Sequence, residues 1–168
     1  MNYSFDVIVI GAGAAGLMCA IESAKRNKKV LVLDHAKKIG EKIRISGGGR
    51  CNFTNLNTHP SKFISKNPKF MISALNKYDQ YDFIKLVESY KIKFHEKKLG
   101  QLFCDESSQQ IIDLLLSECE KYQVKINKEF IVEDIYYSNE LYKVKFVDHF
   151  LSCQSLVIAT GGLSIPKI

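Results

Sequence analysis

Residues 40–55 combine features that suit the binding of an anionic ligand. The stretch reads Gly-Glu-Lys-Ile-Arg-Ile-Ser-Gly-Gly-Gly-Arg-Cys-Asn-Phe-Thr-Asn. Three consecutive glycines leave backbone N–H groups that no side chain shields, and Lys42, Arg44 and Arg50 add positive charge. This combination favours a large, planar, anionic ligand held against the backbone.

A second glycine pattern lies upstream, where Gly11-x-Gly13-x-x-Gly16 follows a short apolar run. In a strand–turn–helix unit the first glycine permits a tight turn, the second lets the backbone approach a pyrophosphate, and the third allows close helix–strand packing. The phosphates are then expected on the N–H groups at the helix start, near Ala14 and Ala15. The pattern predicts a dinucleotide site.

The acid that such a site needs is Asp34, which stands 23 positions after Gly11 at the end of the second predicted strand. An acid there accepts hydrogen bonds from the adenosine ribose and disfavours a 2′-phosphate, which argues against NADP in this site. NAD and FAD both stay open on the fingerprint alone. The long basic, glycine-rich segment that follows favours FAD, because NAD-only folds usually continue from the second strand into another helix.

The elements that would position these residues follow an α/β pattern. A buried strand over 5–10, a helix over 14–27 and a strand over 29–33 form a βαβ unit, whose crossover should be right-handed. Residues 36–59 show no sustained period and are expected to form a long functional loop. The remaining predicted elements are helices over 68–78, 80–90 and 107–122, a hairpin over 92–104, and strands over 124–126, 130–136, 141–147 and 155–159.

Composition describes a globular chain of 168 residues, 46% apolar and 25% charged, with a net charge of +6. Residues 25–50 hold nine Lys or Arg against two acids. The basic excess therefore belongs to the segment beside the glycine motifs and fits a phosphate-bearing ligand. With no basic stripe interleaved with aromatics elsewhere, no nucleic-acid partner is expected.

Five cysteines without a Cys-x-x-Cys spacing argue against a disulfide framework or zinc site and for a reducing compartment. The apolar run 7–21 lacks a basic leader and is too short to span a membrane, so a cytoplasmic location is expected. Cys51 could be a redox centre, but without a partner at close spacing it is better read as a packing residue. Histidines at four positions are expected on the surface or in loops: His35, His59, His95 and His149.

Residues 40–55, together with Gly100-Gln101-Leu102-Phe103 and the stretch from Leu156 to Lys167, resemble the YhiN/BaiN-like flavoproteins, NAD(P)/FAD-dependent enzymes of the aminoacetone-oxidase family. The resemblance implies an α/β fold: a Rossmann-like, glutathione-reductase-like FAD-binding domain with a parallel central sheet and a small antiparallel β meander. It covers the N-terminal portion of such proteins. Residues 1–168 are accordingly expected to be incomplete at the C-terminus, without the substrate domain and the C-terminal FAD segment.

The resemblance also implies site roles. The pyrophosphate would lie on the glycine turn, the ribose on Asp34, the adenine on the Val132 backbone, and the flavin along the basic loop. The cofactor-binding set is Gly11, Gly13, Ala14, Ala15, Gly16, Asp34, Lys42, Gly48, Arg50, Cys51, Asn52, Val132, Thr160 and Gly161. The chain departs from the family where Asp34 replaces a usual Glu, and where Gln101 and Cys104 replace a usual Arg and Pro.

The expected function is that of an FAD-binding oxidoreductase that moves a hydride through FAD to or from a small molecule, with NAD(P)H as a candidate donor. No catalytic side chain and no metal-ligand spacing is identified, as expected where a cofactor carries the chemistry. Two alternatives stay open: a truncated, non-catalytic FAD- or ADP-binding fragment, and an FAD-dependent RNA-modifying protein. No membrane partner is expected, and a surface left by missing domains could support self-association.

Overall fold

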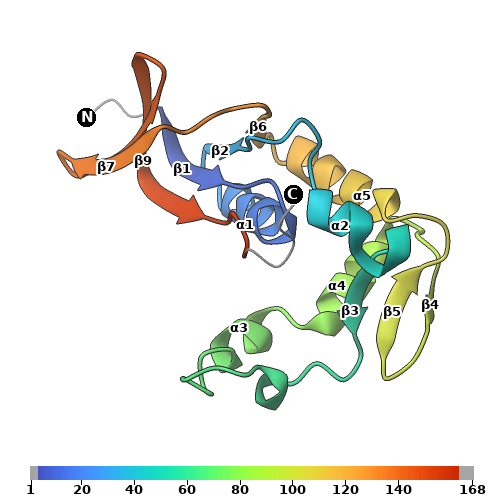
Figure 1. The fold of residues 1–168 in the computed structure, drawn as a ribbon. Helices are drawn as coiled ribbons and strands as arrows, with labels where there is room; N and C mark the ends of the chain where they lie inside the picture. Colours follow the sequence, from blue (N-terminus) through green and yellow to red (C-terminus); the bar gives the residue numbers. More distant parts are fainter. Residues whose placement is uncertain (1–3, 163–168) are drawn as a thin grey trace. The chain divides into compact units, whose positions relative to one another are not determined.

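The computed structural model describes residues 4–162 (Figure 1), and the chain divides into two compact units. The first unit combines the described residues up to Lys42 with those from Leu115 onward, and the second is Ile43–Leu114. Helix α5 (Gln109–Lys121) contains one boundary. Within residues 4–162 no helix is both long and apolar enough to cross a membrane.

A six-stranded mixed sheet is the centre of the first unit, in the order β6-β2-β1-β9-β8-β7. Strands β6, β2, β1 and β9 are parallel to one another, whereas β8 pairs antiparallel with β9 and β7 antiparallel with β8. The strand bounds are β1 Phe5–Ile10, β2 Val30–Leu33, β6 Lys125–Asn127, β7 Asp134–Ser138, β8 Leu141–Phe146 and β9 His149–Ile158. This is the expected parallel sheet with an antiparallel β meander.

Strand β9 belongs to both halves of that sheet. Its first part pairs with β8, from His149 opposite Phe146 to Cys153 opposite Tyr142. Its last part runs beside β1 as far as Ile158 opposite Ile10. The meander therefore delivers the chain directly to the end of β1, where the glycine turn begins.

Helix α1 (Ala14–Ala24) packs against β1 and β2. It buries Leu17, Ala20 and Ile21, which recur at helical spacing. It ends at Ala24, and Asn27, with a φ of 58°, turns the following backbone away from the helix. A separate apolar cluster contains residues of the parallel strands and of the meander: Phe5, Ile8, Leu31, Leu33, Val144 and Cys153.

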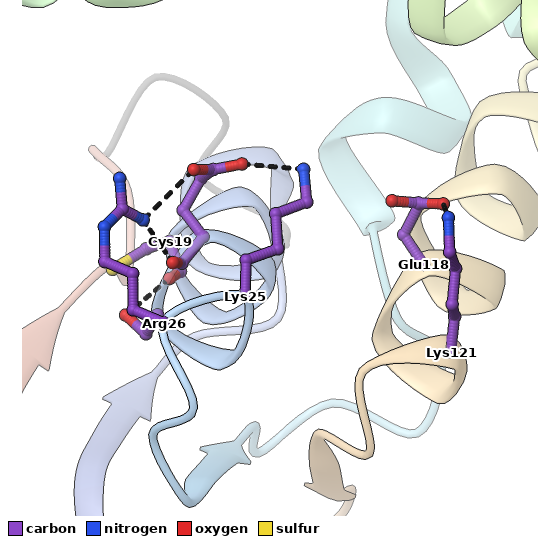
Figure 2. A network of polar contacts seen from close by, with 7 residues as sticks. Cys19, Lys25, Arg26, Glu118 and Lys121 are labelled. Atoms are coloured by element: carbon purple, nitrogen blue, oxygen red, sulfur yellow. Dashed lines mark hydrogen bonds and ion pairs between the residues drawn. The ribbon is translucent and has the colours of Figure 1, made fainter.

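The ends of α1 and α5 are held by polar contacts (Figure 2). Glu22 accepts from Lys25 at 2.8 Å and lies 3.1 Å from Nη1 of Arg26, while Lys121 lies 3.2 Å from the buried carboxylate of Glu118. These pairs join residues three or four positions apart, which are neighbours on a helix surface. The Lys25 ammonium also lies 5.6 Å from the ring centre of Tyr122.

The second unit contains a three-stranded antiparallel sheet in the order β3-β5-β4. Phe53 of β3 contacts the rings of Phe83 on α4 and Phe94 on β4 and so connects helix and sheet. The bounds are α2 Glu41–Ile45, the 3-10 turn η1 Ser46–Gly49, β3 Asn52–Asn55, the 3-10 turn η2 Pro60–Lys62, α3 Ile72–Lys77, α4 Gln80–Ser89, β4 Phe94–Glu96 and β5 Gln101–Cys104.

The predicted fold class is confirmed, and so are the βαβ unit, the hairpin and the helices. One expectation was wrong: residues 36–59 are not a structureless loop, because α2, η1 and β3 lie within them. Those elements are four or five residues each, too short to show a period. Strand β9 is also longer than the predicted 155–159, because its first half pairs with β8 of the meander.

Candidate functional site

The glycine turn joins β1 to α1 and leaves the helix start accessible. Gly13 is the N-cap of α1, no side chain caps the helix there, and Ala14 and Ala15 are exposed. A Cβ built on Gly13 would meet nothing within 4 Å. The first-turn N–H groups therefore border an open space that a pyrophosphate could enter.

The other two glycines permit close backbone approach. A Cβ on Gly11 would meet the carbonyl of Ala159, the residue after β9, and a Cβ on Gly16 would meet the carbonyl oxygen of Gly11. Gly11 also has a φ of 108°, which favours glycine. Gly11 thus lets β9 end beside the turn, and Gly16 lets α1 lie close to β1.

Asp34 lies at the end of β2 with its side chain 13% exposed. Its Oδ2 accepts from the Ala12 N–H at 2.5 Å, and its Oδ1 accepts from the Ala36 N–H at 2.8 Å. One carboxylate therefore holds the glycine turn and the start of the next segment together. Each oxygen keeps further acceptor capacity for a ribose hydroxyl.

The loop after β2 and the turn after β9 also converge on this part of the first unit. The Gly40 N–H donates to the Ala12 carbonyl at 3.1 Å, and the Lys42 ammonium donates to the Gly162 carbonyl. Gly161 has a φ of 75°, and its missing Cβ would lie 3.3 Å from Nζ of Lys42.

Thr160 is exposed on the same turn after β9. Val132 is partly buried against the apolar cluster of the sheet. The predicted residues of the first unit thus lie on its glycine turn, the end of β2, the residues after β9 and the segment before β7.

The remaining predicted residues belong to the second unit. Gly48 is exposed in η1 with a φ of 68° and no atom within 4 Å of its missing Cβ. Arg50 is exposed directly after η1, and Asn52 is exposed at the start of β3. Cys51 between them is 5% exposed, and its N–H donates to the Ser46 carbonyl at 3.0 Å.

The structure gives Cys51 a neighbour that sequence spacing did not reveal. The Cys104 N–H donates to the Arg50 carbonyl at 3.0 Å, and Cys51 contributes to the raised pKa of Cys104. Burial is the main cause for both thiols: it raises the pKa of Cys51 and raises the pKa of Cys104 to about 12. Both are free thiols and are kept un-ionised at neutral pH, which favours packing over thiolate chemistry.

Two histidines have acidic neighbours that sequence reasoning did not assign. His35 lies 3.7 Å from Oδ1 of Asp34, although its side chain is 81% exposed. His95 lies 2.7 Å from Asp105 at the edge of the small sheet. The antiparallel register of β4 and β5 explains the second pair, because it brings residues ten positions apart into contact.

Four backbone positions of the site were missed: Ala12, Ala36, Ala159 and Gly162. Each acts through an N–H or carbonyl group rather than its side chain. Each lies within two positions of Gly11, Asp34 or Gly161 in the sequence, and that proximity is the signal that could have identified them. Within residues 4–162, no cluster of His, Cys, Asp or Glu side chains is arranged to hold a metal ion.

The chain is similar to known proteins over nearly its whole length. A model of the HI0933-like protein Rossmann domain matches residues 5–168. The chain is 52% identical over 172 residues to a ribosomal RNA dihydrouridine synthase of Haemophilus influenzae and 48% identical over 164 residues to one of Escherichia coli. These matches cover 100% and 98% of this chain but 43% and 41% of the relatives. The chain therefore spans about two fifths of the length of those relatives.

Solved structures share the fold at low sequence identity. A 3-ketosteroid-delta4-(5alpha)-dehydrogenase from Rhodococcus jostii RHA1 matches 96% of this chain with a TM-score of 0.66 and 16% identity, over 47% of its own length. The OTEMO complex with FAD and NADP matches 100% of this chain with a TM-score of 0.60 and 17% identity, over 28% of its own length.

Proposed function

Because this chain belongs to the HI0933-like Rossmann family, we propose that it supplies the ADP-binding part of an FAD-dependent oxidoreductase. The observation that carries the proposal is the first-unit geometry: an uncapped helix start bordered by open space at Gly13, beside a carboxylate at Asp34. Phosphate and ribose are the groups that these donors and acceptors recognise.

In this proposal the pyrophosphate accepts from the N–H groups at the start of α1, where Ala14 and Ala15 carry no bulky side chain. Asp34 accepts from a ribose hydroxyl while its bonds to Ala12 and Ala36 keep the carboxylate in place. Thr160 and Gly161 provide a second stretch of backbone along the cofactor. Lys42 adds positive charge near the phosphates.

The residues present fit this cofactor, because a Cβ at Gly13 would enter the open space and a longer residue at Ala14 would cover the helix start. Bound FAD would supply hydride transfer, and the chain's own residues bind and orient it. We propose NAD(P)H as the electron donor. Gly48, Arg50, Cys51 and Asn52 of the second unit are proposed to serve the flavin portion.

For the substrate of the whole protein we propose a uracil base in ribosomal RNA. The support is that the relatives at 52% and 48% identity, which match essentially the whole of this chain, are ribosomal RNA dihydrouridine synthases. Conversion of uridine to dihydrouridine adds a hydride and a proton across the C5–C6 double bond, while NAD(P)H becomes NAD(P)⁺. The RNA-modifying alternative of the sequence analysis therefore ranks above the small-molecule substrate as a proposal.

Two measurements test the proposal. Titration of the purified chain with FAD should quench flavin fluorescence to saturation, and ADP should compete; a chain that never quenches it overturns the cofactor part. Ribosomal RNA from source cells lacking the gene should lose dihydrouridine when its nucleosides are measured by mass spectrometry. Unchanged dihydrouridine with intact FAD binding would leave the small-molecule alternative, with reduction of a small carbonyl or enone as its assay.

A further inference from the structure

An exposed segment of the second unit combines positive charge with aromatic rings. Residues 60–78, here called the Lys/Phe segment, contain no Asp or Glu. They carry four lysines: Lys62, Lys66, Lys69 and Lys77. All four are exposed, as is every residue from 61 to 70. The acid-free stretch in fact begins at Lys42 and ends before Asp79. The expectation that no basic stretch outside residues 25–50 is interleaved with aromatics was therefore wrong.

Large apolar side chains lie between those lysines and are left facing solvent. Phe63 is 39% exposed, Phe70 is 71% exposed and Ile64 is fully exposed. Burial drives folding, so a ring left in water beside cations points to a partner of opposite charge that offers flat surfaces.

The backbone of the segment is held in turns by its own polar groups rather than by a sheet. The Ser61 N–H donates to Nδ1 of His59, the Asn67 N–H donates to Ser65, and the Lys69 N–H donates to the Asn67 side chain. In Figure 1 the segment, with η2 and α3, extends beyond the end of β3. It therefore presents its side chains without contributing a strand to the small sheet.

We infer that the Lys/Phe segment binds unpaired RNA, an inference that rests on the proposed RNA substrate. The lysines would contact phosphates, and Phe63 and Phe70 would stack on bases. Positive charge that tracks the backbone and aromatic faces that accept any base are the two features by which proteins hold single strands. An acid-free segment suits a polyanion, because none of its own side chains is a carboxylate that would repel the phosphates.

The test measures binding of a fluorescein-labelled oligouridylate to the FAD-loaded chain by fluorescence anisotropy over a range of salt. The triple variant Lys62→Ala, Lys66→Ala, Lys69→Ala should reduce the magnitude of the slope of log affinity against log salt by about 2, since each phosphate contact to a single strand contributes about 0.7. Phe63→Ala and Phe70→Ala should each weaken binding about fivefold or more.

A matched control replaces three exposed lysines of the first unit, Lys28, Lys125 and Lys128, with alanine. This variant has the same net charge as the segment triple variant and should retain the slope of the wild type to within about 0.7, one phosphate contact. Circular dichroism and FAD binding of every variant should match the wild type, because the substituted side chains are exposed.

The inference would be overturned by equal loss of binding in both triple variants, by no binding of the oligouridylate to the wild type, or by binding of anionic phosphatidylserine vesicles through the segment without RNA binding. A change in sedimentation without a change in RNA affinity would equally assign the segment to a protein contact. None of these results decides the proposed function, which is judged by dihydrouridine in ribosomal RNA and by FAD titration.

Discussion

Asp34 has two roles, of which the sequence predicted only one. The expected task is to accept from a ribose, but the structure also makes its carboxylate the acceptor for the N–H groups of Ala12 and Ala36. Replacing it therefore leaves two partly buried donors unsatisfied. Asp34→Ala should lower the free energy of unfolding by about 1–3 kcal/mol and should also weaken FAD binding, measured by urea denaturation and flavin fluorescence.

Asp6 offers a matched control for that variant. It too is an aspartate that accepts from a backbone N–H, that of Lys29 at 2.6 Å, but it lies in β1 at the end opposite the glycine turn. Asp6→Ala should reduce stability and leave FAD affinity unchanged. Equal FAD affinity in the Asp34 variant and the wild type would show that the carboxylate is structural alone.

The buried thiols give a pH-dependent prediction. An ordinary thiol has a pKa of 9.0, whereas burial raises that of Cys104 to about 12. The unfolded chain therefore loses this proton at lower pH than the folded chain, so the thiol's contribution is fully present below pH 9.0 and falls as the pH rises toward 12. Urea denaturation across this window should show the decline.

In the variant Cys104→Ala, the free energy of unfolding should fall less steeply with pH, and the slope should differ from that of the wild type by the amount that corresponds to about one bound proton. Near neutral pH the folded chain should also protect Cys51 and Cys104 from iodoacetamide, since the thiolate is the reactive form. Rapid alkylation of either residue in the folded protein, located by peptide mass spectrometry, would contradict the packing role and return Cys51 to the redox candidates.

At the scale of elements, two glycines of the strand–turn–helix unit are expected to affect different properties: Gly16 affects stability and Gly13 affects cofactor binding. Gly16→Ala should destabilise the protein by about 1–3 kcal/mol, because the added methyl would collide with the Gly11 carbonyl where α1 crosses β1. Gly13→Ala should change stability by less than about 0.5 kcal/mol, because its φ of −85° suits alanine and nothing lies within 4 Å.

The affinity for FAD should be affected in the opposite order, with the larger loss in Gly13→Ala and the smaller loss in Gly16→Ala. The Gly13→Ala methyl enters the space proposed for the pyrophosphate, so FAD titration should show a clear loss of affinity while thermal denaturation stays that of the wild type. Undiminished FAD affinity in Gly13→Ala would move the proposed phosphate position away from the helix start. Measuring ADP alongside FAD tells whether the loss concerns the phosphates or the flavin.

At the scale of the whole molecule, the residues proposed to bind ADP belong to one compact unit made from two separated parts of the chain. ADP alone should therefore stabilise the protein. At about one hundred times its dissociation constant it should add about 2.7 kcal/mol to the free energy of unfolding, visible as a rise in melting temperature. FMN, which lacks the adenosine, should stabilise far less at the same concentration, and equal stabilisation by both would contradict the assignment.

Much of the fold could be predicted because its cues are local. Continuous apolar runs marked β1 and β2, and helical spacing marked α1, α4 and α5. The short elements α2, η1 and β3 escaped prediction because four or five residues hold too little periodic signal. The first half of β9 escaped because it pairs antiparallel with β8 in the meander, and that long-range pairing leaves no continuous apolar run.

The sequence by itself determined the nucleotide fingerprint, the acid at position 34 and the glycine-rich residues 40–55, because these depend on residue type and spacing over short stretches of the chain. Only the tertiary structure decided which groups those residues meet: Asp34 with Ala12, Gly11 with Ala159, and Cys51 with Cys104. Such contacts depend on strand order and register, which join positions far apart in the chain and leave no local pattern. Exposure of the Lys/Phe segment was decided in the same way, since burial is a property of the packed chain.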